Sequence, residues 1–85
     1  MSNADKVERL RAKATALHAA GQLAEAEQAY RHILELWRSD LSARYMIGVV
    51  KLQQGRPAEA LAMLEPLIAE APDNADIRTQ CGLAR

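Results

Sequence analysis

Apolar residues recur at helical spacing along most of the chain. In the first segment, Val7, Leu10, Ala14 and Leu17 follow one another at intervals of three or four residues, which places them on one face of a helix. Similar stripes continue downstream, and no run of alternating apolar and polar residues indicates a strand. The pattern therefore predicts an all-α fold of about five helices, at residues 5–20, 23–37, 41–54, 57–71 and 75–84.

The predicted helices are separated by residues that end or begin helices. Gly21 and Gly55 can adopt the left-handed conformation that closes a helix without a Cβ penalty. Either Ser39 or Asp40 can accept hydrogen bonds from the first N–H groups of the third helix. Pro57 suits the first turn of the fourth helix, where no N–H is needed.

A short segment repeats at an interval of 34 residues. Residues 21–26 read GQLAEA and residues 55–60 read GRPAEA. An overlay of 7–40 on 41–74 gives four identities, all within this segment, so the repeat is centred on one turn and the helix start after it. We accordingly divide the chain into an N-terminal extension (1–6), two repeats (7–40 and 41–74), and a cap or the first helix of a third repeat (75–85).

This arrangement resembles the tetratricopeptide repeat, whose pattern is W-x2-L-G-x2-Y, then A-x3-F, then P. The second repeat reads Arg44-x2-Ile47-Gly48-x2-Lys51, then Ala60-x3-Leu64, then Pro72. The first reads Leu10-x2-Lys13-Ala14-x2-Leu17, then Ala26-x3-Tyr30, and a third begins as Arg78-x2-Cys81-Gly82-x2-Arg85. The resemblance implies a right-handed α-solenoid of antiparallel helix–turn–helix hairpins, with two full repeats and the first helix of a third.

Small residues occupy the positions where helices in such a solenoid approach closely. Ala14, Gly48 and Gly82 would let the two helices of a hairpin meet, while Ala26 and Ala60 would let a hairpin touch its neighbour. The predicted structural positions, including the two turn glycines, are Ala14, Gly21, Ala26, Gly48, Gly55, Ala60 and Gly82.

Arg44 and Lys51 depart from the family pattern, because they are charged where it prefers large apolar groups. We expect their alkyl stems to cover the surface while their charged heads reach water.

The resemblance also implies that the first helices of the repeats build a concave binding face. The residues expected there as partner-binding candidates are Arg11, Thr15, His18, Tyr45, Met46, Val49, Leu52 and Gln53, together with Glu8, Ala19, Ser42, Asp76, Thr79 and Leu83. Two readings of the apolar members stay open: they pack against neighbouring helices, or they form an apolar groove for an extended peptide or an amphipathic helix. In the second reading Tyr45 is an exposed aromatic anchor.

One use of the family fold can be tested on the sequence. Members that bind chaperone tails hold carboxylates with a Lys/Asn/Asn/Lys/Arg clamp, and the matching positions here are Arg11, Thr15, Met46, Asp76 and Gln80. Only Arg11 keeps a suitable charge, and Asp76 would repel a carboxylate. The sequence therefore predicts that this chain is not a receptor of that type.

Composition and charge narrow the possible functions. Eleven Lys and Arg balance eleven Asp and Glu, so there is no basic surplus of the kind that favours nucleic acid or an anionic membrane. No apolar run approaches the roughly 20 residues that span a bilayer. A single cysteine, Cys81, cannot form an internal disulfide and favours a reducing cytoplasm.

No motif in the sequence predicts catalysis. His18, His32 and Cys81 are too widely spaced to form a metal site, and the glycines do not form a phosphate-binding loop. We therefore expect no cofactor, no bound metal and no enzymatic activity.

The leading hypothesis is a cytoplasmic, non-enzymatic scaffold that binds a protein or peptide on its concave face, within a larger bacterial protein. One alternative is a regulatory or substrate-presenting arm of a transferase. It comes from residues 17–34, which resemble bacterial tetratricopeptide segments that precede glycosyltransferase-like, sulfotransferase-like or methyltransferase-like domains. The other alternative is a self-assembly module. Two repeats and a fragment leave solenoid faces open, so the chain is either trimmed from a longer protein, naturally ended by a minimal cap, or a homo-oligomer docked through its ends.

Overall fold

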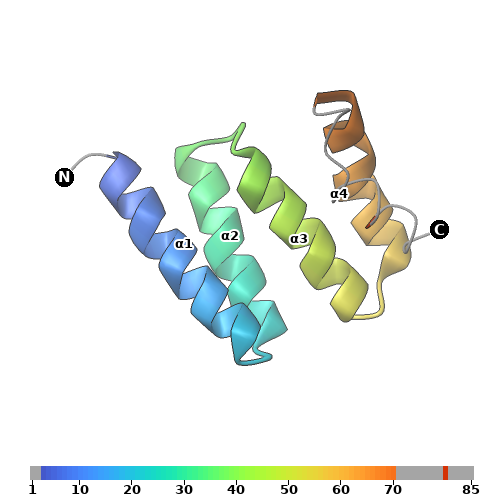
Figure 1. The fold of residues 1–85 in the computed structure, drawn as a ribbon, viewed down its shortest axis with the longest axis horizontal. Coiled ribbons are helices and arrows are strands. Elements are labelled where there is room, and N and C mark those ends of the chain that lie inside the picture. The colour runs from blue at the N-terminus through green and yellow to red at the C-terminus, as the bar shows by residue number, and fades with distance from the viewer. Residues whose placement is uncertain (1–2, 71–79, 81–85) are drawn as a thin grey trace.

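In the described part of the chain, helices α1 to α4 form two antiparallel hairpins that lie side by side (Figure 1). The computed structural model describes residues 3–70 and Gln80. The helices are α1 (Asn3–Ala19), α2 (Leu23–Leu36), α3 (Leu41–Gln53) and α4 (Pro57–Glu70). No strand occurs among the described residues, so the predicted all-α class is confirmed. Except for Gln80, which is helical, the predicted fifth helix at 75–84 and its Gly82 lie outside the described part of the chain.

The two hairpin turns are built identically. Gly21 and Gly55 have φ of +79° and +74°, the left-handed region that the sequence predicts for them. In the first turn the N–H of Gln22 donates to the carbonyl of Leu17 (2.9 Å), and the N–H of Gly21 donates to that of His18 (3.0 Å). This pair of bonds is the Schellman motif, which satisfies the last carbonyls of α1. The turn after α3 repeats both bonds at the equivalent positions.

The connection between the hairpins differs from the prediction at one residue. Asp40 caps α3, because its Oδ1 accepts a 2.8 Å hydrogen bond from the N–H of Ala43. The predicted second helix, 23–37, ends on Trp37, and helical spacing places this residue on the same apolar stripe as Tyr30 and Ile33. However, α2 ends at Leu36, and Trp37 is extended and 42% exposed. The helical spacing placed Trp37 on the inner face, but the chain has already left the helix there.

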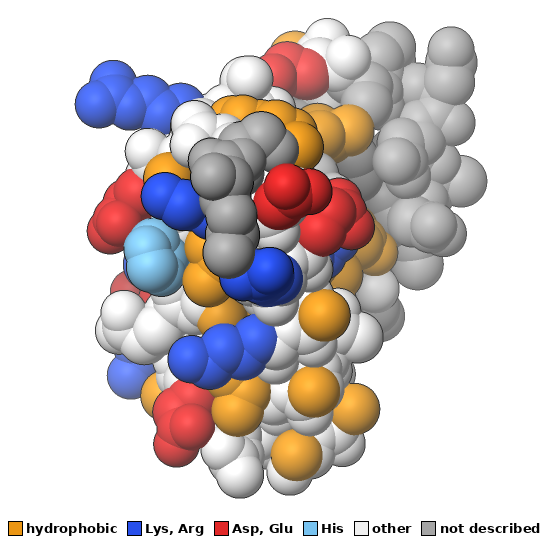
Figure 2. Space-filling view, turned by 90° about the vertical axis from the view of Figure 1, so that its left-hand side faces the viewer, with side chains coloured by type: hydrophobic (Ala, Val, Ile, Leu, Met, Phe, Trp, Pro, Cys, Tyr) orange, Lys and Arg blue, Asp and Glu red, His pale blue; other side chains and the backbone are white. Residues whose placement is uncertain are grey.

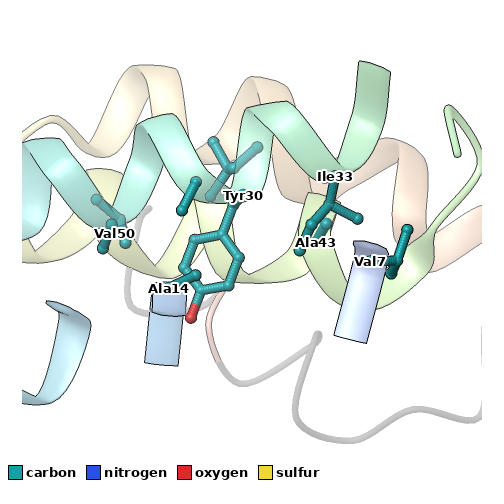
Figure 3. Close-up of a cluster of buried hydrophobic side chains, with 9 residues drawn as sticks. Val7, Ala14, Tyr30, Ile33, Ala43 and Val50 are labelled. Carbon is teal, nitrogen blue, oxygen red and sulfur yellow. The ribbon is translucent and has the colours of Figure 1, made fainter. Parts of the chain in front are cut away.

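Large side chains of one helix fill the space above small residues of its hairpin partner. A Cβ added to Gly48 would lie 2.6 Å from Cγ and Cδ2 of Leu64, so α3 and α4 meet at this glycine. In the first hairpin Ala14 and Tyr30 occupy the equivalent positions, and the Tyr30 ring points toward Ala14 (Figure 3). Ala14 and Gly48 thus lie at the helix crossings where the sequence predicts small residues. Both residues are buried, as are Ala26 and Ala60.

The two hairpins are joined by apolar packing and by a buried ion pair between α2 and α3. Ala43, Ile47 and Val50 of α3 belong to the same core cluster as Ile33 of α2. Beside this cluster, Nζ of Lys51 lies 3.0 Å from Oε1 of Glu27, and the two side chains are only 9% and 13% exposed.

The expectation that the Lys51 head reaches water is therefore wrong. The Lys51 stem lies against the hairpin interface, and the ammonium group ends beside a carboxylate of α2 instead of at the surface. Arg44 is also paired: its Nη2 lies 2.6 Å from Oε2 of Glu70 on α4, at a more exposed site. Both departures from the family pattern thus form contacts between helices.

Candidate functional site

Most of the predicted binding residues line one hollow between α1 and α3. The hollow has a volume of about 570 Å³ and lies on the side of the molecule where the first helices of both hairpins face each other. Its lining comes from α1 (Arg11, Thr15, His18, Ala19), from α3 (Ser42, Met46, Gln53), and from Tyr30 of α2. Five of the eight predicted partner-binding residues are among them.

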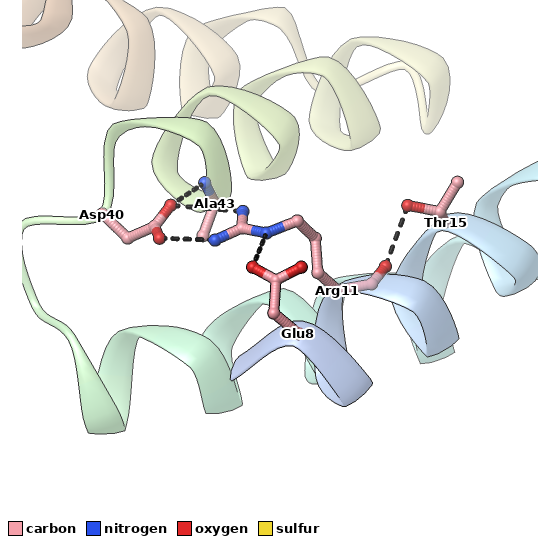
Figure 4. A network of polar contacts seen from close by, with 5 residues as sticks. All are labelled: Glu8, Arg11, Thr15, Asp40 and Ala43. Carbon is pink, nitrogen blue, oxygen red and sulfur yellow. Dashed lines mark hydrogen bonds and ion pairs between the residues drawn. The ribbon is translucent and has the colours of Figure 1, made fainter. Parts of the chain in front are cut away.

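Arg11 is held in place at one end of this hollow (Figure 4). Its Nη2 donates to Oδ2 of Asp40 at 2.8 Å and its Nη1 lies 3.4 Å from Oδ1, while its Nε lies 3.9 Å from Oε1 of Glu8. The guanidinium of Arg11 lowers the pKa of Asp40, and the hydrogen bond to Asp40 raises the pKa of Arg11. Because Asp40 also caps α3, this one carboxylate connects α1 to the start of α3.

His18 closes the opposite end of the hollow. Its Nε2 is hydrogen-bonded to Oε1 of Gln53, so the last turns of α1 and α3 are joined here as well. The His18 ring also meets the Tyr30 ring edge to face, with centroids 6.4 Å apart at an angle of 84°. Burial raises the pKa of Tyr30, against the opposing effects of Thr15 and Arg11, so Tyr30 is a neutral wall of the hollow.

Apolar surface outweighs polar surface in this hollow, and the guanidinium that lines it is paired. Among the described residues that line it, Arg11 contributes a permanently charged guanidinium, which Asp40 and Glu8 neutralise. The hydroxyl of Thr15 donates to the carbonyl of Arg11 at 2.8 Å. Ser42 adds a second hydroxyl, and Met46 contributes an apolar side chain. Such a surface suits hydrogen bonding to neutral amides and packing of a small apolar group.

The remaining predicted residues lie elsewhere. Val49 and Leu52 line a second, smaller hollow of about 410 Å³ together with Gln53 and Gln80. Tyr45 is half-buried and packs against the cluster of Ala60, Leu64 and Leu67, so it is not an exposed aromatic anchor. For Tyr45 the packing interpretation holds, because its position on α3 turns it toward α4.

Sequence reasoning missed one wall of the hollow. In the sequence analysis Tyr30 occupies only the large apolar position of the family pattern. Its side chain is buried, yet its ring packs against the His18 ring and lines the hollow. The available signal was the family position of Tyr30, where a large residue sits opposite the small Ala14. That position predicts contact with α1, and α1 is also the helix that carries His18.

The described residues offer no metal centre. Among residues 3–70 and Gln80, no group of three or more His, Cys, Asp or Glu side chains lies close enough to hold a metal ion. Within the same residues, no helix is long and apolar enough to cross a membrane. The candidate residues Asp76, Thr79, Cys81 and Leu83 lie outside the described part of the chain.

The paired hairpins, with a glycine-ended turn in each and a small residue at each crossing, define an α-solenoid. Comparison with known families agrees: the sequence pattern of the tetratricopeptide repeat matches residues 17–82. The chain belongs to the tetratricopeptide repeat family, which is a fold of protein–protein interaction and generally not of catalysis. A comparison with curated proteins finds no match.

Proposed function

We propose that this chain is a non-enzymatic scaffold whose hollow between α1 and α3 binds an extended segment of a partner protein. The observation that supports this most directly is the position of the hollow. Residues of two different hairpins line it, and these are the helices that carry the concave face in this family. A volume of about 570 Å³ has room for a few side chains of a peptide, not for a globular surface.

The charge of the hollow indicates the kind of segment. Since Asp40 already neutralises Arg11, an acidic peptide would have to displace an internal ion pair to reach that cation. Neutral polar groups and Met46 are directly accessible instead. We therefore propose that the bound segment is uncharged where it crosses the hollow, and that its main-chain amides pair with side chains such as Thr15 and Gln53.

This proposal predicts a weak dependence of binding on salt. Exposed ion pairs are screened at high ionic strength, whereas hydrogen bonds and apolar contacts are not. Peptides selected from a random library against the chain should keep their dissociation constants within about threefold between 50 and 500 mM NaCl. Selected peptides that are rich in Asp and Glu, with affinity that falls steeply with salt, would contradict the neutral-segment proposal while leaving the site itself intact.

A pair of substitutions on α1 tests the location. Thr15→Trp places a large ring in the hollow, whereas Ala16→Trp adds the same ring at the next exposed position, which does not line it. Binding of a selected peptide should fall at least tenfold with Thr15→Trp and stay within about twofold with Ala16→Trp. Equal affinity of the two variants, or a library that yields no peptide, would refute the assignment of the hollow.

A further inference from the structure

The outer face of the first hairpin, on the side away from α3, carries a second open surface. A hollow of about 440 Å³ lies between α1 and α2 there, and we name this surface the end face. It is lined by Leu10, Lys13, Leu17, Glu25, Gln28, Ala29, His32 and Glu35. Figure 2 views the molecule from the α1 end and shows hydrophobic side chains at the surface between basic and acidic ones.

The equivalent surface of the second hairpin shows how such a face is used when another hairpin packs against it. Lys13 and Leu17 on the end face correspond to Ile47 and Lys51 of the second hairpin, 34 residues later. In the second hairpin these positions are buried, because α3 packs against α2 of the preceding hairpin. The end face therefore has the construction of a hairpin surface that receives another helix, and the half-buried Leu10 and Leu17 are its apolar part.

Opposite charges are divided between the two helices of the end face. The α1 side carries Lys13, and the α2 side carries Glu25 and Glu35. Glu35 has only a 3.9 Å contact with His32, and no ion pair joins Lys13 or Glu25 to any residue within 3–70. This division makes the face complementary to itself. A two-fold axis parallel to the helices lays α1 of one copy over α2 of the other, so that each basic side meets an acidic side.

We propose that the end face is the interface of a homodimer. A second copy of this chain covers Leu10 and Leu17 of α1 with the α2 side of its own end face, which carries Gln28, Ala29 and His32. Lys13 of each copy then lies within reach of Glu25 of the other, and the contact closes after two copies because it is isologous. The end face is separate from the hollow between α1 and α3, so this inference does not depend on the proposed function.

Sedimentation velocity over a concentration series tests the dimer. The wild-type chain should show a reversible monomer–dimer equilibrium. Lys13→Glu and Glu25→Lys each place like charges at two symmetric contacts and should each raise the dissociation constant about tenfold. The double variant Lys13→Glu/Glu25→Lys restores opposite charges and should return the constant to within about threefold of wild type. Arg56→Glu makes the same charge change at the α3–α4 turn and should have no effect.

Hydrogen exchange supplies a readout that needs no variant. Amides of residues 10–17 and 25–35 should become about tenfold better protected at concentrations where the dimer forms, while amides of α4 should not change. A wild-type chain that stays monomeric up to millimolar concentration would overturn the proposal. A dimer that neither charge reversal weakens, or protection that rises only outside the end face, would overturn it as well.

Discussion

Replacing Gly48 with alanine tests whether the close approach of α3 and α4 depends on the missing side chain. The added methyl group would lie 2.6 Å from Cγ and Cδ2 of Leu64, whereas carbon atoms in contact are normally about 3.5–4.0 Å apart. Leu64 is fully buried with Ala60 and Leu67, so its side chain has no open space to turn into. The two helices must therefore move apart by about 1 Å at their crossing point.

Two opposing effects set the magnitude for Gly48→Ala. Overpacking a close-packed core costs about 1–3 kcal/mol, and replacing glycine by alanine within a helix contributes about 1 kcal/mol of stability. We expect a net loss of about 0–2 kcal/mol in the free energy of unfolding, or a melting temperature lower by up to roughly 15 °C for a domain of this size. Urea and thermal unfolding followed by far-ultraviolet circular dichroism measure both quantities.

A second background separates the two effects. Leu64→Ala removes the atoms that the new methyl group would meet, so Gly48→Ala in that background should be neutral or stabilising by up to about 1 kcal/mol. Ala12→Gly, at an exposed position of α1, serves as a control for helix propensity and should cost about 1 kcal/mol. If Gly48→Ala stabilises the wild-type chain, or acts equally in both backgrounds, our account of the helix crossing is refuted.

Three further predictions concern the other contacts between helices. Glu27→Ala leaves the buried Lys51 ammonium without its carboxylate and should cost about 2–3 kcal/mol of stability. Lys51→Met removes the buried cation itself and should change the stability by less than about 1 kcal/mol. Equal losses of the two variants in urea unfolding would contradict a buried pair. Asp40→Asn keeps a capping side chain but loses the charge, so it should cost about 1 kcal/mol at pH 7. The pKa of Asp40 is lowered on folding, so the stabilisation by its charge is present above the unfolded pKa of about 4 and is lost as the pH falls through the lower folded pKa. A stability difference between wild type and Asp40→Asn that does not shrink below pH 4 would disprove this role of the charge. Ala60→Trp should cost about 1–3 kcal/mol or more in thermal unfolding by overpacking a fully buried site, and a neutral result would place Ala60 outside the core.

The local features of this protein follow from the sequence because they depend on neighbouring residues. Gly21 and Gly55 end helices through their own backbone freedom, and Asp40 caps α3 through a bond to the third residue after it. The 34-residue interval relates Ala14 to Gly48, and it thereby predicts a close helix crossing in each hairpin. The apolar stripe of the first helix predicted its buried face, since Val7 and Ala14 are buried and Leu10 and Leu17 are half-buried.

Only the tertiary structure decided which charged residues meet. Lys51 lies 24 residues after Glu27 and sits at a position where its own helix pattern expects an apolar group, so no local rule connects the two. Their pairing depends on how the second hairpin is placed on the first. The same placement brings Asp40 to Arg11, so that the guanidinium of Arg11 is already paired where it lines the hollow. Periodicity determines the direction in which a side chain leaves its helix, but the packing of one hairpin on another determines what it encounters there.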